Sequence, residues 1–216
     1  MVLKGQFLER PTLIPLAGGL VLEGVSHRGE LRPGLLVLPP PPVEGSGMDH
    51  VVGAELAFAV SRLGHPTLRF NYRGVGGSQG AVSKQPAAWL EDARAALELA
   101  RDNADGHVVV VASIGASDAV ALKLAELEPV AALALINPSI VTPGDLSSVA
   151  VPLAVIVAEL DPTQDRAAWS VALEPHDGVL TVVAGATPTY QRGLPEVGKA
   201  VASLVGRAGA RRSQGR

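Results

Sequence analysis

Two serines, Ser113 and Ser117, lie in the part of the chain that best fits a turn carrying a nucleophile. The stretch from Val108 to Leu122 predicts a buried strand, a tight turn and a helix. In that context a G-x-S-x-G turn holds a serine at the top of a parallel sheet, where its hydroxyl can attack an acyl carbon. Here the turn reads Ser-Ile-Gly-Ala-Ser, with Gly115 at its centre. The nucleophile is therefore missing from its expected position.

Two registers of this turn are open. In the preferred one, Gly115 makes the sharp bend without the Cβ penalty that a serine would pay, and we predict a positive φ, or a value near it, at this residue. A shift of two residues would instead centre Ser117 in a G-x-S-x-A sequence and leave a working hydroxyl. That alternative lengthens the preceding strand and supplies no histidine as a base.

The elements that must position this turn follow an α/β pattern. Short β-branched runs alternate with longer stretches of helical period, which predicts a mainly parallel sheet with helices on both faces. The expected strands are 20–27, 35–38, 67–71, 107–112, 130–136, 153–158 and 179–184. The expected helices are 49–63, 86–103, 116–127, 165–173 and 195–205. With no helix between them, the first two strands are expected to form an antiparallel hairpin at one edge.

A dense motif follows the third expected strand. Residues 69–80 read Arg-Phe-Asn-Tyr-Arg-Gly-Val-Gly-Gly-Ser-Gln-Gly. This segment resembles the Arg-Phe-(Asn/Asp)-(Phe/Tyr)-Arg-Gly-x-Gly-x-Ser-x-Gly segment of small, lidless α/β-hydrolases, which are similar to dienelactone hydrolases and short acyl esterases. Two rival nucleotide-binding motifs fail, because Gln79 replaces a required glycine and the loop has no lysine. The resemblance extends over about residues 35–205.

The resemblance assigns a position to each member of a catalytic triad. It places Gly115 at the nucleophile, Asp161 at the acid, and Pro188, three residues beyond Gly185, at the base. Glycine has no attacking group and proline cannot carry a proton, whereas a triad needs both a nucleophile and a base. We therefore expect no catalytic residue.

The oxyanion hole that the resemblance implies is also degraded in this chain. Its first donor, the N–H of Ala116, is still present. The family's loop resembles His-Pro-His-Pro, but this chain has four prolines at 39–42, which supply no N–H donor. The remaining candidates for a second donor or a pocket wall are Gly45, Ser46, Gly47 and Met48.

Composition predicts one soluble domain. Of the 216 residues 47% are hydrophobic but only 3% are aromatic, so alanine, valine and leucine must fill the core. No cysteine is present, which excludes disulfides and thiolate metal sites and is compatible with the cytoplasm. Met1–Pro11 lacks the apolar core of a secretory signal. The longest apolar run, 149–158, is half the length of a membrane span.

Charge separates the chain into residues 1–206 and a basic end. The last ten residues carry a charge of +4, from Arg207, Arg211, Arg212 and Arg216. Because the net charge of the whole chain is −3, residues 1–206 carry −7. An acidic body argues against a nucleic-acid surface, and residues 207–216 are expected to form a mobile tail. The acidic group Glu159, Asp161 and Asp165 has neither calcium-loop spacing nor a histidine partner, so no metal is expected.

These patterns favour one function over another. The preferred hypothesis is an α/β-hydrolase-fold protein that has lost catalysis and acts as a binding or scaffold module, without a cofactor. Its partner would be a small molecule or a protein rather than nucleic acid or membrane. The alternative is an active hydrolase of a small ester or thioester that uses Ser117 or an unconventional base.

Overall fold

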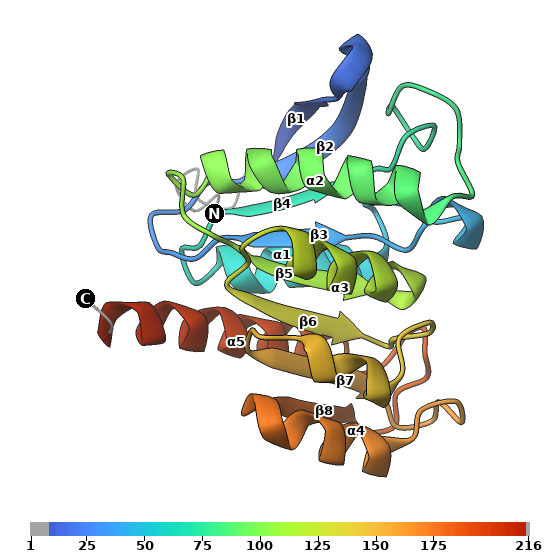
Figure 1. Cartoon of the computed structure of the whole chain (residues 1–216), viewed down its shortest axis with the longest axis vertical. Coiled ribbons are helices and arrows are strands. Elements are labelled where there is room, and N and C mark those ends of the chain that lie inside the picture. The colour runs from blue at the N-terminus through green and yellow to red at the C-terminus, as the bar shows by residue number, and fades with distance from the viewer. Residues whose placement is uncertain (1–8, 215–216) are drawn as a thin grey trace.

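A single sheet forms the centre of the molecule. The computed structural model describes residues 9–214, with side chains as far as residue 210. In this part of the chain the sheet has eight strands in the order β1-β2-β4-β3-β5-β6-β7-β8 (Figure 1). The strands are β1 (Arg10–Pro15), β2 (Val21–His27), β3 (Leu35–Leu38), β4 (Thr67–Phe70), β5 (Val110–Ile114), β6 (Ala132–Ile136), β7 (Leu153–Ala158) and β8 (Val179–Val183). Pairing is antiparallel at β1–β2 and β2–β4 and parallel elsewhere.

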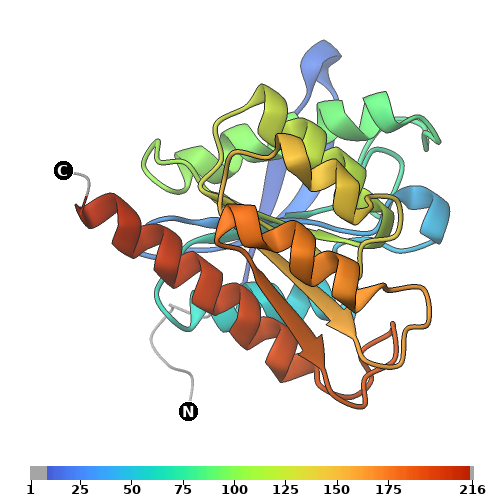
Figure 2. The same ribbon diagram turned by 60° about the horizontal axis from the view of Figure 1, so that its bottom comes forward.

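Helices cover both faces of this sheet. On one face lie α1 (Val51–Ser61) and α5 (Leu194–Gln214), and on the other lie α2 (Pro86–Asp102), α3 (Asp118–Leu127) and α4 (Arg166–Leu173). Short 3₁₀ turns lie in the connections, among them η2 (Pro42–Glu44), η3 (Gly115–Ser117) and η4 (Pro143–Ser148). The turned view in Figure 2 shows the sheet between the two helix layers.

The central strands of the sheet have no polar face. Every residue of β5, β6 and β7 is buried, because helices cover them on both sides. Leu36 and Leu38 face the layer of α2 and α3, whereas Leu35 and Val37 face the layer of α1 and α5. Each fully buried leucine contributes about 2 kcal/mol to folding. Many small apolar side chains thus replace the few large aromatic ones of a typical core.

The sequence-based elements are largely confirmed, and so is an antiparallel edge near the N-terminus, but the strands expected to pair there are wrong. The strands at 20–27 and 35–38 do not form a hairpin, because β4 pairs with both and lies between them. The true hairpin partner of β2 is β1, which was not among the expected strands. Pro11 and Pro15 argue against a strand in general, yet an edge strand tolerates them because one side makes no ladder bonds.

The C-terminal helix is longer than expected. It runs to Gln214 instead of ending near residue 205, so the segment from Arg207 is helical where a separate tail was expected. Mobility of this basic end stays a prediction. The side chains of Arg211, Arg212 and Arg216 lie outside the described residues, as do Met1 and the seven residues after it. In the part of the chain that is described, no helix combines the length and apolarity needed to cross a bilayer.

Candidate functional site

The turn after β5 keeps the geometry of a nucleophile elbow. Ile114 is still extended, with φ −122° and ψ 128°, and Gly115 turns the chain with φ +57° before α3 begins at Asp118. The positive φ predicted for Gly115 is confirmed. Because the strands around β5 are parallel, their carboxyl ends meet here, and we call this end of the sheet the crest.

A carboxylate from another loop lies over the turn. The N–H of Ala116 donates to Oε1 of Glu44 at 3.2 Å. A Cβ added to Gly115 would lie 2.9 Å from Oε2 of the same side chain. Glu44 thus takes the space into which a nucleophile would project, and it accepts the N–H that was expected to be the first oxyanion-hole donor. This residue is absent from the predicted site, although it directly precedes the loop candidates.

Those candidates serve the loop itself. Gly45 has φ +67° and donates its N–H to the carbonyl of Pro42 at 3.1 Å. The N–H of Met48 donates to Oδ1 of Asn71 at 2.7 Å. Gly47 lies against the same asparagine, because a Cβ there would be 2.4 Å from Oδ1. Ser46 is half-buried between them. Two of the expected donors are therefore already used within the chain.

Ser117, the alternative nucleophile, lies beneath the surface. Its side chain is fully buried, and its Oγ donates to the carbonyl of Pro39 at 2.5 Å. The hydroxyl of Tyr72 lies 3.0 Å from the same Oγ. Since Ser117 already donates to Pro39, Tyr72 is the donor in this second bond. Ser117 therefore joins the proline loop to the Arg69–Gly80 segment and is not presented to a substrate.

Asp161 lies at the end of β7, where the triad acid is expected, but its oxygens are engaged. Oδ1 accepts the N–H and the hydroxyl of Thr163 at 2.9 and 2.7 Å, and Oδ2 accepts Nδ2 of Asn137 at 2.8 Å. Burial alone would raise the pKa of Asp161, but the hydrogen bonds from Thr163 and Asn137 outweigh it and lower that pKa. The carboxylate stays ionised and holds neighbouring loops.

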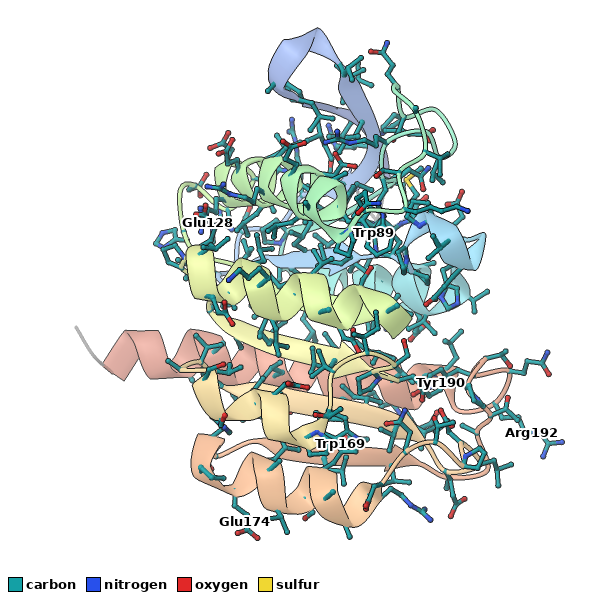
Figure 3. The ribbon with its side chains drawn as sticks, turned by 45° about the vertical axis from the view of Figure 1, so that its right-hand side comes forward. Trp89, Glu128, Trp169, Glu174, Tyr190 and Arg192 are labelled. Atoms are coloured by element: carbon teal, nitrogen blue, oxygen red, sulfur yellow. The ribbon has the colours of Figure 1, made fainter. Side chains whose placement is uncertain are left out.

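The base position holds no proton carrier. Pro188 is exposed in the loop between β8 and α5. Two residues later Tyr190 turns inward, with φ +49°, and its buried hydroxyl donates to Oδ1 of Asn137 and the carbonyl of Ile156, both at 3.2 Å. Burial raises the pKa of Tyr190 well above its usual value. Figure 3 shows Tyr190 inside the molecule and Arg192 of the same loop pointing outward.

The histidines are placed mostly at the opposite end of the sheet. Four of them end β2 or precede β4, β5 and β8, at the amino ends of the parallel strands: His27, His65, His107 and His176. Only His50, before α1, lies on the crest side; its Nδ1 is buried without a partner, and burial lowers its pKa. Among the residues that the structure describes, no histidine shares a hydrogen bond with Ser117, Asp161 or Glu44.

The acidic residues near the crest serve local structure. Glu159 accepts the N–H of Gly185 at 2.7 Å, and Asp165 caps α4 by accepting the N–H of Ala168 at 3.0 Å. Within the described ranges, no group of three or more histidine, aspartate or glutamate side chains is arranged to hold a metal ion.

The Arg69–Gly80 segment, in contrast, is held by many hydrogen bonds from its side chains. The buried Arg69 donates to the carbonyl of Met48 and to Asp49, both at 2.8 Å. Arg73 donates through its backbone N–H and its Nε to Asp92, a fully buried carboxylate on α2, at 2.9 and 2.8 Å. These bonds fix the segment against the loop before α1 and against α2.

Comparison with solved structures identifies this architecture. The chain is similar to an α/β serine hydrolase homologue from Coxiella burnetii, with a TM-score of 0.76 and 24% identity over 91% of this chain and 97% of that one. A lidless α/β serine hydrolase from Xanthomonas campestris gives a TM-score of 0.75 and 23% identity over 92% and 94%. The protein has a lidless α/β-hydrolase fold.

A further likeness is to Est1E of Butyrivibrio proteoclasticus, solved with ferulic acid bound, with a TM-score of 0.77 and 14% identity over 92% and 99% of the two chains. At these identities the likeness is one of fold. No protein-family model matches the chain. Two uncharacterized proteins of Mycobacterium tuberculosis, from strains CDC 1551 and H37Rv, are each 36% identical over 156 residues. That match covers 70% of this chain and 53% of each relative, so the chain spans about half their length.

Proposed function

We propose that this α/β-hydrolase-fold protein has no serine-type catalysis and that its crest is a binding or scaffold site. The observation that supports this most strongly is the contact of Glu44 with the Gly115 turn. In a serine hydrolase the N–H after the nucleophile stabilises the negative oxyanion of the intermediate. Here that N–H, from Ala116, already donates to a carboxylate, whose charge would repel an oxyanion.

The proton-transfer half of the machinery supports the same proposal. A serine needs a base within hydrogen-bond reach, and the base needs a group that orients it. Pro188 stands where the resemblance puts the base, and the Asp161 oxygens accept from Thr163 and Asn137. Installing a nucleophile alone would therefore leave it without a base.

The surface of the crest supports a binding role. Three large apolar side chains on separate crest loops are more than half exposed: Val43 before Glu44, Ile140 after β6, and Leu160 after β7. Exposed apolar side chains at the same end of the sheet as a charged group offer contact area and orientation to a small molecule or a protein partner. The cysteine-free composition suits the reducing cytoplasm, which is the location we propose.

The catalytic part is tested by fluorophosphonate labelling and by turnover of short-chain esters and thioesters. We expect neither labelling nor turnover for the wild-type protein. Ser117→Ala and His50→Ala identify the alternative: wild-type labelling or turnover that disappears in either variant would establish an active hydrolase and overturn the proposal. An active serine hydrolase in the same assay confirms that the probe and substrates work.

A gain-of-function series tests which losses matter. Gly115→Ser is expected to stay inactive, because it has no base and its Cβ would meet Glu44. Adding Pro188→His and then Glu44→Gln supplies a base and removes the charge over the oxyanion donor. Turnover should be absent in the single variant; its appearance there would show that the chain contains a working base elsewhere.

The binding part needs its own measurement. A thermal-shift screen of small acids, amines and esters should give compounds whose stabilising shift is lost in Glu44→Gln. Glu98→Gln, on the exposed face of α2, is the matched control and should leave the shift unchanged. Shifts that are equal in both variants would place the ligand away from the crest.

A further inference from the structure

The two edges of the sheet differ in how they are protected. The outer strand β1 has Pro11, Pro15 and the charged Arg10. The other edge, β8, reads Val-Leu-Thr-Val-Val, without proline or charge, and Val179 and Val182 are 38% and 37% exposed. Prolines and charges are the usual devices that stop an edge strand from pairing with another chain. An edge that lacks them is suited to pairing.

The backbone of β8 has hydrogen-bonding groups that point outward. The carbonyl of Val183 accepts the N–H of Glu159, so the peptide groups of Val183 face β7. Because these directions alternate along a strand, Thr181 also faces β7, whereas Leu180 and Val182 face away from it. In the described part of the chain, β8 pairs with no strand other than β7. An N–H and a C=O of each of these two residues are thus free for a partner.

Helix α4, which packs on β8, has a positive charge at one end and a negative charge at the other. Each charge would therefore meet its opposite on an antiparallel copy of the helix. Arg166 and Ser170 of α4 and Glu174, the helical residue directly after it, are four residues apart and share one side of the helix. Ala168 and Ala172 line the opposite side, in a groove against η4. The Arg166–Glu174 side therefore lies toward the open edge, and Figure 3 shows Glu174 projecting from the foot of the molecule. Within the described residues neither Arg166 nor Glu174 forms an ion pair.

We infer that a second copy of this chain docks on this edge, with β8 antiparallel to the partner's β8 about a two-fold axis through Thr181. In this register Leu180 pairs with the partner's Val182, and Val182 with the partner's Leu180, so all the outward peptide groups are used. Thr181 faces the partner's Thr181, a favourable cross-strand pair. The two α4 helices then run antiparallel, and Arg166 meets the partner's Glu174.

Symmetry is the reason for choosing a second copy over another protein. An interface with two-fold symmetry requires that each contact occur twice, with the roles of the two residues exchanged. The outward strand residues are centred on Thr181, and the two charges are centred on Ser170. Strand and helix therefore both satisfy this requirement without any change to the chain, and the central sheet would continue from one copy into the other.

The test is the oligomeric state in solution, measured by sedimentation velocity over a concentration series. We expect a wild-type dimer that dissociates on dilution and a monomeric Val182→Lys variant, since each lysine would lie opposite the partner's apolar Leu180 and diagonal to the partner's lysine. Val171→Lys changes a 66% exposed valine on the outer side of α4 and should remain dimeric. A specific dimer of this kind should form below about 100 µM. A wild-type protein that is still monomeric at that concentration overturns the inference.

Charge exchange on α4 tests the orientation without touching the strand. Arg166→Glu and Glu174→Arg should each weaken the dimer roughly tenfold, because each turns two attractions into two repulsions. Mixing the two single variants should give a heterodimer, because every facing pair is then of opposite charge. A mixture that stays as weak as the separate variants would exclude the antiparallel α4 contact and so this dimer. Because these surface changes leave the core intact, the result stands even if Val182→Lys does not fold.

Discussion

Two regions of the molecule resemble the hydrolase pattern in different ways. In the Arg69–Gly80 segment the pattern is intact in sequence, and its arginines, its asparagine and its tyrosine hold neighbouring loops and helices. At the positions that the resemblance assigns to the triad the turns are kept, but Gly115 and Pro188 have no groups for chemistry. The first region reports on the fold and the second on activity. A match in the Arg69–Gly80 segment therefore does not imply catalysis.

The largest effect should come from the buried partner of Arg73. Asp92→Ala removes a fully buried carboxylate and leaves the arginine without its inner acceptor, so we expect a loss of about 3 to 5 kcal/mol in the free energy of unfolding. Urea denaturation at neutral pH measures it. Glu91→Ala, which removes the exposed partner of the same arginine, should cost less than about 1 kcal/mol. Equal costs would show that burial does not decide the strength of this site.

Next comes the serine beneath the turn. Ser117→Ala leaves the Pro39 carbonyl and the Tyr72 hydroxyl without a partner in a buried place, and should lower the free energy of unfolding by about 2 kcal/mol. Ser113→Ala is the matched control, because the buried Oγ of Ser113 has no hydrogen-bond partner in the described structure. Denaturant unfolding of both variants should show a cost for Ser117 only. A cost-free Ser117→Ala would argue against a structural role.

A smaller effect is expected at the turn itself. Gly115→Ala places a side chain at φ +57°, which costs about 1 to 2 kcal/mol, and brings its Cβ against Glu44. Gly185→Ala, at φ +63° with nothing within 4 Å of the new Cβ, carries the backbone cost alone. The difference in unfolding free energy between the two variants isolates the Glu44 contact. It should vanish when Glu44→Ala is added to Gly115→Ala.

The smallest effect concerns pH. Because the folded-state pKa of Asp161 lies below its unfolded value, this group stabilises the fold above the unfolded pKa of about 3.9, and the benefit is lost as pH falls through the folded pKa. Asp161→Asn should therefore make the acid-side decline of stability shallower. Unfolding midpoints between pH 7 and pH 3 measure it, with the exposed Asp102→Asn as the control. A slope identical to that of the wild-type protein would contradict the hydrogen-bonding role of this carboxylate.

Local patterns were sufficient to predict most elements, since buried strands and amphipathic helices reveal their period in the sequence. They were insufficient for the edge, because which strand lies beside β2 depends on the path of the whole chain. The same limit applies to the site. Gly115 and Asp161 follow strands and were predicted, but Glu44 reaches the turn from a loop far away in sequence. Nothing local to Asn137 or Tyr190 shows that they meet.

Asn137 has a consequence for the mechanics of the crest. Its left-handed backbone, φ +50°, aims one amide side chain at three segments: Nδ2 at Asp161, and Oδ1 toward the N–H of Ala158 and the hydroxyl of Tyr190. The ends of β6 and β7 and the loop after β8 are thereby tied to a single residue. Two of these hydrogen bonds are between neutral groups and one is accepted by the ionised Asp161, so the three segments are linked without a histidine. A ligand that binds at the crest would therefore contact strand ends and a loop that are already held in place.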